Sequence, residues 1–194
     1  NCGDCRGCGA NLVKNGNFSA GNAGFGSALL FSNVYPLSAG RYTITNNAQL
    51  ANGNWRGRDH TSPPTGLFFA ADGALAFSNA WTQSIPVQKN TNYSFCFWVT
   101  NLDRVGLTLT PPNLAAVING VQIAASGALP VTNTTTSTTW QLVTVVWNSG
   151  PNNFANVAVR ELSNASSGND YGIDDISFIQ VSPTSAKAGP DTGI

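Results

Sequence analysis

The clearest alternation of apolar and polar positions runs from Asn92 to Leu102, with the sequence NYSFCFWVTNL. Large apolar side chains fall on one face of this segment. Small or polar side chains, together with Trp98, fall on the other. A repeat of two residues is that of a β-strand, and aromatic and β-branched side chains favour a half-buried, pleated surface. Burial of the apolar face contributes about 2 kcal/mol per large side chain. We therefore predict that this segment is the central strand of the fold.

The rest of the chain shows the same alternation, or short apolar runs bounded by Gly, Pro and Asn, and no convincing helical repeat. The Asn-Gly pair at 119–120 is a strong signal for a hairpin turn. The pattern predicts an all-β fold, an antiparallel two-sheet β-sandwich (jelly roll) with negligible helix. The segments expected to form strands are 11–18, 28–34, 40–45, 66–71, 81–87, 92–102, 115–123, 140–147, 154–162 and 171–181. In the first of these, a short apolar strand is expected to run into a turn at the Asn-Gly pair 15–16.

A length of 194 residues suits one β-sandwich domain, which we assign to residues 11–181. Residues 1–10 are expected to form a Cys/Gly-rich arm, and residues 182–194 a linker toward a following domain. The chain begins with Asn and contains no Met, which favours a processed or trimmed piece of a longer protein.

The composition excludes several classes of protein. Charged residues make up 9% of the chain and the net charge is zero, so nothing attracts it to nucleic acid or to an anionic membrane. The 42% of hydrophobic residues can form a core, and no apolar run approaches the roughly 20 residues that span a bilayer. A surface rich in Asn and Thr and poor in Lys and Glu is typical of extracellular β-proteins. We expect a secreted, cell-surface location.

The four cysteines are Cys2, Cys5, Cys8 and Cys96. An even number in an extracellular context favours disulfides. The C-x-x-C-x-x-C spacing is also similar to that of iron–sulfur or zinc ligands, but no second cluster accompanies it. We expect a disulfide that fastens the N-terminal arm, and the pairing is open because four cysteines allow three connectivities. The alternative for Cys96 is to be fully buried beside the arm as a small hydrophobic residue.

A polar loop at 51–66 is a candidate functional region, because long loops in compact domains often carry function. It holds the single histidine, His60, next to Asp59, and a tryptophan among polar residues, Trp55. We expect Trp55 to be the most exposed tryptophan, and the two tryptophans of segment 140–147 to belong to the core.

Signals for catalysis are weak. The chain has one histidine, His60, one glutamate, Glu161, and no recognisable nucleophile motif. Asp59 is better explained as an acceptor of backbone hydrogen bonds in its loop than as part of a triad. The adjacent Asp174 and Asp175 are expected to point to opposite faces of a strand and not to converge on one substrate. We expect a protein that is not an enzyme.

Three segments together resemble one family. NLVKNGNF at 11–18 is similar to its opening strand, WTQSIPVQKNTNYSFCFW at 81–98 to a pair of strands, and YGIDDISF at 171–178 to its closing strand. The family is that of the carbohydrate-binding modules with the galactose-binding-like jelly-roll fold, and the resemblance covers residues 11–181. The tail AGPDT at 188–192 resembles the start of the immunoglobulin-like repeats in large secreted proteins of gliding, surface-active bacteria.

The resemblance implies a non-catalytic extracellular module that tethers a larger protein to a polysaccharide or another glycan. The sugar is expected on the sheet face that carries Trp98 or under the 51–66 loop, since an indole stacks on the apolar face of a pyranose. The alternative for Trp98 is to pack beneath a loop. The candidate ligand-binding residues are Trp55, Arg56, Arg58, Asp59, His60, Gln83 and Trp98.

The resemblance also implies a structural Ca²⁺ near the opening strand, held by hard oxygen ligands. Asn17 and Asp174 match two of the family's ligand positions, but the family's usual glutamate is Ser19 here, which removes a charged ligand. The alternative for Asp174 is a carboxylate that accepts hydrogen bonds from N–H groups of a loop.

A second function class fits the same fold, which also serves in adhesins and assembly domains. In it the chain is a structural or adhesive cell-surface subunit that self-associates or packs against neighbouring domains. The zero net charge permits association, because charge repulsion is weak.

Overall fold

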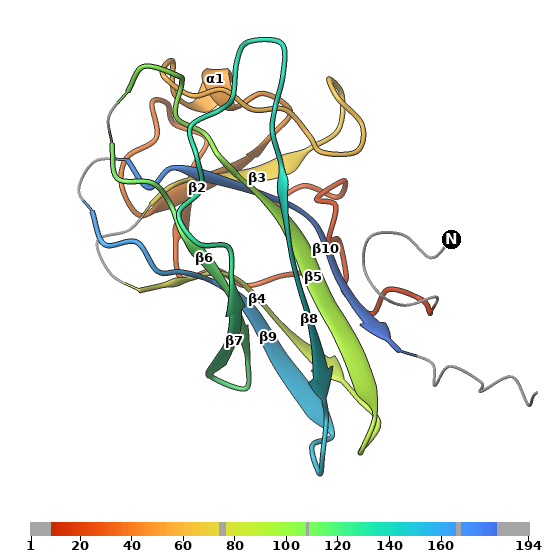
Figure 1. The fold of residues 1–194 in the computed structure, drawn as a ribbon. Coiled ribbons are helices and arrows are strands. Elements are labelled where there is room, and N and C mark those ends of the chain that lie inside the picture. The colour runs from red at the N-terminus through yellow and green to blue at the C-terminus, as the bar shows by residue number, and fades with distance from the viewer. Residues whose placement is uncertain (1–8, 74–76, 108, 166–167, 182–194) are drawn as a thin grey trace, which may run out of the picture.

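Two β-sheets stack face to face in the computed structural model, which describes residues 9–73, 77–107, 109–165 and 168–181 (Figure 1). The predicted two-sheet β-sandwich is confirmed. The larger sheet has the strand order β1 (Leu30–Phe31), β2 (Arg41–Thr45), β3 (Phe68–Asp72), β10 (Tyr171–Gln180), β5 (Asn92–Asn101) and β8 (Gln141–Asn148). The smaller sheet has the order β4 (Asn79–Pro86), β9 (Phe154–Glu161), β6 (Leu114–Ile118) and β7 (Val121–Ala125).

β5 has the central place that its alternation predicts, since it pairs with β10 on one side and β8 on the other. Its inward side chains, Tyr93, Phe95, Phe97 and Val99, are all buried in the main core between the sheets. The ring of Tyr93 stacks on that of Phe178 in β10, with centroids 4.9 Å apart. At about 2 kcal/mol per large side chain, this face is a major source of the stability of the sandwich.

The predicted opening strand at 11–18 is wrong. This segment runs beside β10, where the Leu12 N–H donates to the carbonyl of Phe178 over 2.9 Å, but it forms no strand. Asn15 and Phe18 have φ angles of 55° and 53°, in the left-handed region that an extended chain excludes. The apolar pair in its sequence therefore anchors a turn rather than a strand.

Two further local differences concern the segment before β3. Residues 28–34 form only the two-residue β1, which runs parallel to β2, whereas the other strand pairs of the described chain are antiparallel. A single helical turn, α1 (Ala48–Ala51), precedes the long loop, and the side chain of Asn47 caps it by accepting from the Gln49 N–H.

β10 is interrupted by a β-bulge between Asp174 and Ser177. Asp175, inside the bulge, has a φ of 45°. Ile173 and Ile176 are three residues apart and yet both face the core, so the alternation of faces changes phase here. The period of two therefore fails at the two adjacent aspartates.

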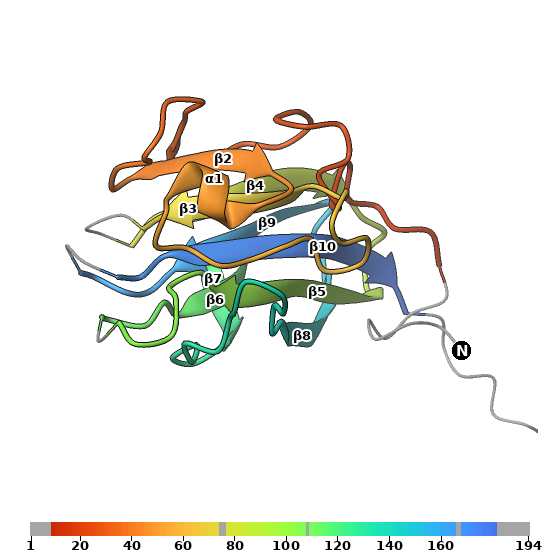
Figure 2. The same cartoon turned by 90° about the horizontal axis from the view of Figure 1, so that it is seen from above.

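α1 and the loop after it cover the outer face of the larger sheet, crossing β2, β3 and β10 (Figure 2). They enclose a second, smaller core with Trp55 inside it, fully buried. The expectation that Trp55 is the most exposed tryptophan is wrong. The reason is that the outward side chains Phe68, Ala70 and Leu102 are apolar and need a cover, which the loop supplies.

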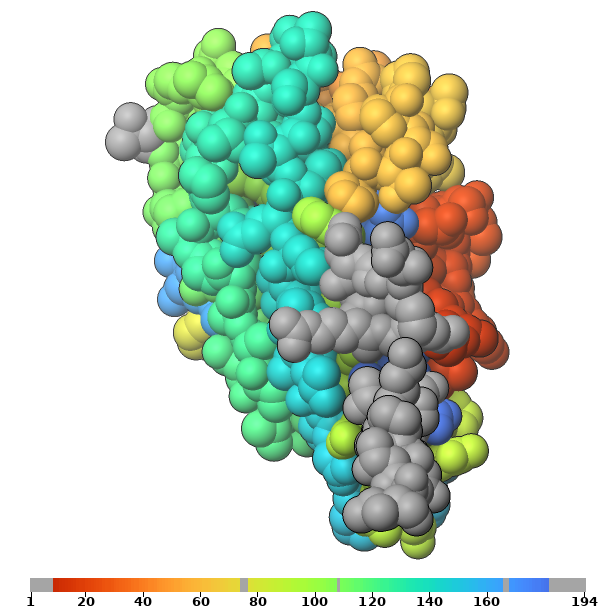
Figure 3. Space-filling model, turned by 45° about the vertical axis from the view of Figure 1, so that its right-hand side comes forward, coloured from red at the N-terminus to blue at the C-terminus, as the bar shows by residue number. Residues whose placement is uncertain are grey.

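The 51–66 loop also packs against the segment that leads into β8. The Arg58 N–H donates to the Thr138 hydroxyl over 2.9 Å, and the Trp140 indole donates to the carbonyl of Arg58 over 3.2 Å. Figure 3 shows the loop, in orange to yellow, as a lobe beside this teal segment. Trp140 and Trp147 both pack against buried apolar clusters, as expected.

Cys96, on the outer face of β5, is fully buried, and it is not a free cysteine. Its Sγ lies 2.9 Å from the Ser177 hydroxyl. The other three cysteines and the 182–194 linker lie outside the described residues, so the disulfide framework and the linker stay predictions. Within the described residues, no helix is long and apolar enough to cross a membrane.

Candidate functional site

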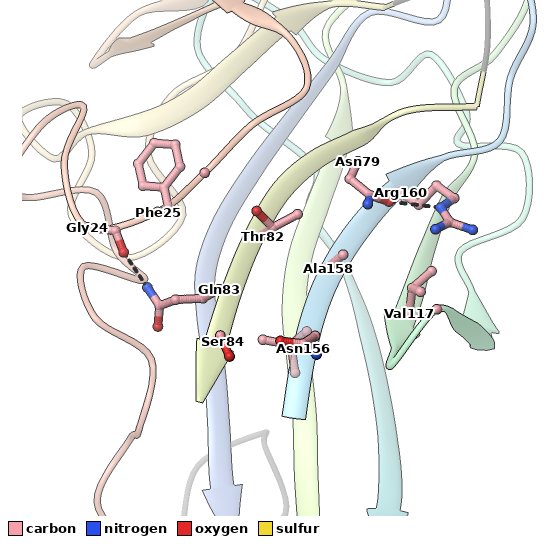
Figure 4. Close-up of a pocket in the computed structure, with 13 residues that line it drawn as sticks. Gly24, Phe25, Asn79, Thr82, Gln83, Ser84, Val117, Asn156, Ala158 and Arg160 are labelled. Atoms are coloured by element: carbon pink, nitrogen blue, oxygen red, sulfur yellow. Dashed lines mark hydrogen bonds between the residues drawn. The ribbon is translucent and has the colours of Figure 1, made fainter. Parts of the chain in front are cut away.

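The outer face of the smaller sheet is hollowed into a groove of about 590 Å³ (Figure 4). Its floor is low where β6 and β9 carry the small apolar side chains of Val117 and Ala158, which form one cluster with Ala115. One wall is the N-terminal loop that carries Phe25. The polar lining comes from Asn79, Thr82, Gln83 and Ser84 of β4 and from Asn156 and Arg160 of β9.

The wall is held to β4 by a short backbone pairing. The N–H groups of Gly26 and Thr82 each donate to the carbonyl of the other, over 2.9 and 2.8 Å. A Cβ at Gly26 would lie 2.8 Å from the Thr82 hydroxyl, so this approach requires glycine.

Gln83 is the predicted ligand residue that lies at the groove. Its side-chain amide donates to the carbonyls of Lys14 and Gly24 over 3.0 and 2.6 Å, and its carbonyl accepts from the Lys14 N–H over 2.9 Å. These three bonds use its carboxamide to hold the wall in place, so Gln83 positions the groove.

The polar side chains that face the groove have hydrogen-bonding capacity to spare. The Nε of Arg160 donates to the side chain of Asn79 over 2.8 Å, and its two terminal nitrogens donate to no atom of the described chain. The side-chain groups of Thr82, Ser84 and Asn156 likewise make no hydrogen bond within the described residues. The groove thus combines free donors and acceptors with an apolar floor.

The other predicted ligand residues gather on the opposite side of the molecule, in the loop over the larger sheet. The imidazole of His60 stacks on the indole of Trp98, with ring centroids 4.0 Å apart, and meets Trp140 edge-on at 5.9 Å. Trp98 therefore packs beneath a loop, which was the alternative considered for it. Its indole face is occupied by His60.

The expectation that Asp174 and Asp175 point to opposite faces of the strand is wrong, because both carboxylates bond the same loop residue. The backbone N–H of His60 donates to Asp174 over 2.9 Å, and the His60 Nδ1 lies 2.7 Å from the carboxylate of Asp175. The Thr61 hydroxyl donates to the same oxygen of Asp175. The β-bulge turns both carboxylates toward one loop residue.

Asp174 is fully enclosed by this arrangement. The pKa of its carboxyl group is raised to about 8. Burial is the largest cause, the charges of Asp175 and Asp59 add to the rise, and the N–H bonds from His60 and Asp175 oppose it. Its oxygens accept from backbone N–H groups, which is the capping role expected as its alternative.

Arg56 and Arg58 also serve the loop. Arg56 donates to the carbonyls of Gly53 and Trp55 over 3.0 and 2.6 Å, and Arg58 to the carbonyl of Asn46 over 3.4 Å. Their side chains therefore help hold the conformation of the loop and of the segment before it.

Asp59 accepts the backbone N–H groups of Thr61 and Ser62, which confirms its expected role in the loop. Its carboxylate packs so closely on Gly66 that a Cβ there would lie within 2.5 Å of both carboxylate oxygens. Asp59 therefore closes the loop and points inward.

Trp55 cannot offer its face to a ligand in this arrangement. Its side chain is fully buried, and its indole N–H donates to Asp170 over 2.8 Å. The polarity of this loop suggested that it was exposed. Its polar side chains instead form hydrogen bonds with the backbone of the loop, as Asp59 does, or with residues of the sheet region, as Trp55 does with Asp170.

Asn17 and Asp174, the expected calcium ligands, do not form a shared ligand set. Asn17 is exposed, and its side-chain oxygen accepts from the backbone and hydroxyl of Ser19. The cavity beside the opening segment is lined by Asn17 and Asp175, and Asp174 is turned toward the loop. Calcium at this place stays a prediction without support from the geometry.

Apart from Gln83, the groove residues of β4 and β9 were missed from the sequence. A usable signal exists at Ser84, Asn156 and Arg160, which alternate with apolar residues in segments that read as strands. That the two segments are neighbours, however, follows from pairing across about 75 residues of chain, for example Ser84 opposite Asn156.

No protein-family model matches the sequence, and no curated protein matches it. Among solved structures, a cyclase from Fischerella sp. TAU is similar with a TM-score of 0.56 and 10% identity, over 87% of this chain and 96% of that chain. The enzymatically active domain of tailspike protein 4 from bacteriophage CBA120 is similar with a TM-score of 0.52 and 17% identity, over 88% of this chain. The chain spans about a fifth (21%) of that domain.

A family 16 carbohydrate-binding module is also matched, with a TM-score of 0.47 and 16% identity, over 87% of this chain and 99% of the module. At identities this low the similarity to the cyclase and the tailspike domain shows the shared β-sandwich and nothing about activity.

Proposed function

We propose that the chain is a non-catalytic carbohydrate-binding domain that holds a glycan in the groove over β4, β9 and β6. The observation that carries the proposal is the groove itself, with a volume of about 590 Å³ and polar side chains free to bond around an apolar floor. This is the size range and the mixture of chemistry that small-molecule sites have. It also suits a sugar ring, which has hydroxyl groups at its edge and C–H groups on its faces.

Each part of the groove has a role in this proposal. The terminal nitrogens of Arg160 present a donor fork to adjacent hydroxyls, and the Asn156 amide offers both a donor and an acceptor. Val117 and Ala158 receive the C–H face of the ring. Phe25, on the wall, supplies an aromatic surface at one side.

The lining supports binding rather than turnover, because it contains no Asp, Glu, His or Cys that could transfer a proton or attack a substrate. The motifs that resemble carbohydrate-binding modules point the same way. In this proposal the domain acts outside the cell and tethers a longer chain to a polysaccharide.

The test compares Arg160→Ala with Arg104→Ala, in which an exposed arginine outside the groove is removed. A glycan array identifies the ligand, and isothermal titration calorimetry with that oligosaccharide gives the affinity. Loss of a charged hydrogen-bond donor at about 1.5–3 kcal/mol should weaken binding by about tenfold or more in Arg160→Ala. Arg104→Ala should bind like the native domain. Absence of binding by the native domain, or equal effects of both changes, would count against the groove.

One observation favours a second function, that of a structural subunit. β1 is the edge strand of the larger sheet, and exposed apolar side chains cluster in and beside it: Leu30, Phe31, Val34 and Tyr35. An open edge with apolar side chains favours association. Sedimentation velocity over a range of concentrations tests this, with Val34→Lys as the variant expected to prevent association. A monomer at every concentration would contradict it.

A further inference from the structure

Three aspartates lie close together where three neighbouring strands of the larger sheet, β3, β10 and β5, begin or end. Tyr171, the first residue of β10, lies opposite Ala71 of β3 and Asn101 of β5. Because β10 is antiparallel to both neighbours, the residue before Tyr171 and the residues that follow Ala71 and Asn101 lie at the same end of the three strands. They are Asp72 at the end of β3, Asp103 after β5 and Asp170 before β10.

All three side chains line a cavity of about 190 Å³. The cavity lies between this end of the strands and the loop that follows α1, whose Trp55 donates its indole N–H to Asp170. Two more oxygen-bearing side chains of that loop, Asn52 and Asn54, line it as well. The lining therefore combines three carboxylates and two amides with the apolar side chains of Leu107 and Leu109.

The carboxylate of Asp103 has an unsatisfied oxygen that a bound ligand could satisfy. Its side chain is buried, with 1% exposure, and its Oδ2 has no hydrogen-bond partner among the described residues. A buried carboxylate oxygen without a partner is costly, and native structures normally satisfy it. Asp103 also lies within hydrogen-bonding reach of the carboxyl group of Asp170. Two ionised carboxylates are both acceptors, so such a contact needs a proton or a cation between them.

No ion pair in the described residues neutralises the cluster, because the pair that is formed is that of His60 with Asp175, at a different place. Arg41 lies opposite Asp72 across the strands but makes no ion pair with it in the described chain.

We propose that this cavity binds a divalent cation, and by its donor chemistry Ca²⁺, through the carboxylates of Asp72, Asp103 and Asp170. Ca²⁺ takes six to eight oxygen ligands in variable geometry, from carboxylates, amide and backbone carbonyls and water. The site is separate from the one expected at Asn17 and Asp174.

Some rearrangement accompanies binding. No three His, Cys, Asp or Glu side chains of the described chain are placed as a ready set of metal ligands. Asp72 is half-buried, and its side chain would turn toward the buried pair when the cation binds. The cation would then join the ends of β3 and β5, the start of β10 and, through Trp55, the loop over the sheet. Its expected effect is on the stability of that loop, independent of the sugar groove.

The test measures Ca²⁺ binding to the whole chain after removal of metal with a chelator. Isothermal titration with CaCl₂ should show binding, and Ca²⁺ should raise the thermal unfolding temperature in a saturable way. Asp103→Asn should weaken the affinity by about tenfold or more, as should Asp72→Asn, which alters a less buried side chain and preserves folding. Asp175→Asn, which removes a carboxylate elsewhere, should leave the affinity unchanged. MgCl₂ serves as the comparison, and it should bind more weakly because Mg²⁺ demands a stricter octahedral geometry.

Two results would overturn the proposal. If Ca²⁺ neither binds nor stabilises the native chain, a shared proton holds Asp103 and Asp170 together. If binding persists in Asp103→Asn and Asp72→Asn but disappears in Asp174→Asn, the ion occupies the opening-segment site instead.

Discussion

The imidazole of His60 stacks on the indole of Trp98, with ring centroids 4.0 Å apart and the planes 23° from parallel. The same imidazole bonds Asp175 through Nδ1. The histidine is thus part of the structure that holds the 51–66 loop on the larger sheet, and the indole that suggested a sugar platform is covered by it.

Replacing His60 by alanine should therefore lower stability and leave glycan binding intact. The change removes an aromatic stack and a hydrogen bond, which together contribute about 1–2 kcal/mol. Urea unfolding monitored by tryptophan fluorescence measures the loss. If His60→Ala instead abolishes glycan binding at unchanged stability, the ligand lies under the loop and not in the groove.

Stability should depend on pH through Asp174. Its pKa is raised from 3.8 to about 8 on folding, so the native state binds the proton more tightly than the unfolded chain does. This contribution is fully present below pH 3.8 and is lost as the pH rises toward about 8. In the presence of a chelator, the unfolding free energy of the native chain should fall with pH more steeply than that of Asp174→Asn. Parallel profiles for the two proteins would contradict this.

Gly66→Ala should destabilise the fold, because the new Cβ would lie within 2.5 Å of both oxygens of the Asp59 carboxylate that closes the loop. A displacement of this size in a packed site costs about 1–3 kcal/mol. Gly53→Ala is the matched control in the same loop, since a Cβ at Gly53 meets no atom within 4 Å. Thermal unfolding of both variants decides the matter, and equal unfolding temperatures would refute the closure by Asp59.

Gln83→Ala should lower stability and glycan affinity together, because Gln83 holds the wall that carries Phe25 through its bonds to Lys14 and Gly24. Asn156→Ala, at the groove and without structural side-chain bonds, should lower affinity alone. Calorimetric titration combined with unfolding curves separates the two effects. A loss of affinity in Gln83→Ala at full stability would make Gln83 a direct ligand residue.

The cysteines should be oxidised. Cys96 is buried and is not free, and the remaining three cysteines belong to the N-terminal arm. Thiol titration of the denatured, unreduced protein should therefore find fewer than the four thiols that the sequence contains. Four reactive thiols would refute the disulfide framework.

The alternation of side chains was sufficient to predict the regular strands. In β5 and β8 every second residue faces the core, because a strand has a period of two and one face is apolar. The hairpin at Asn119 and Gly120 was equally local, since both residues adopt the positive φ that such a turn requires.

The same local information failed where the backbone leaves the regular period. The apolar pair at residues 12–13 belongs to no strand, because left-handed residues follow it at Asn15 and Phe18. The bulge in β10 turned Asp174 and Asp175 to one loop residue, which no alternation pattern indicates.

Only the tertiary structure decided where the functional surfaces are. The polarity of the 51–66 loop was visible in the sequence. The sequence did not show that Trp55 would be buried, or that Arg56 would donate to the carbonyls of Gly53 and Trp55 in the same loop. The groove and the aspartate cluster are each assembled from strands far apart in the chain, β4 with β9 and β3 with β10 and β5. The register between strands is set by the packing of the whole core, and it brings these side chains together. Composition, or the spacing of residues along one strand, does not reveal which strands pair or in which register.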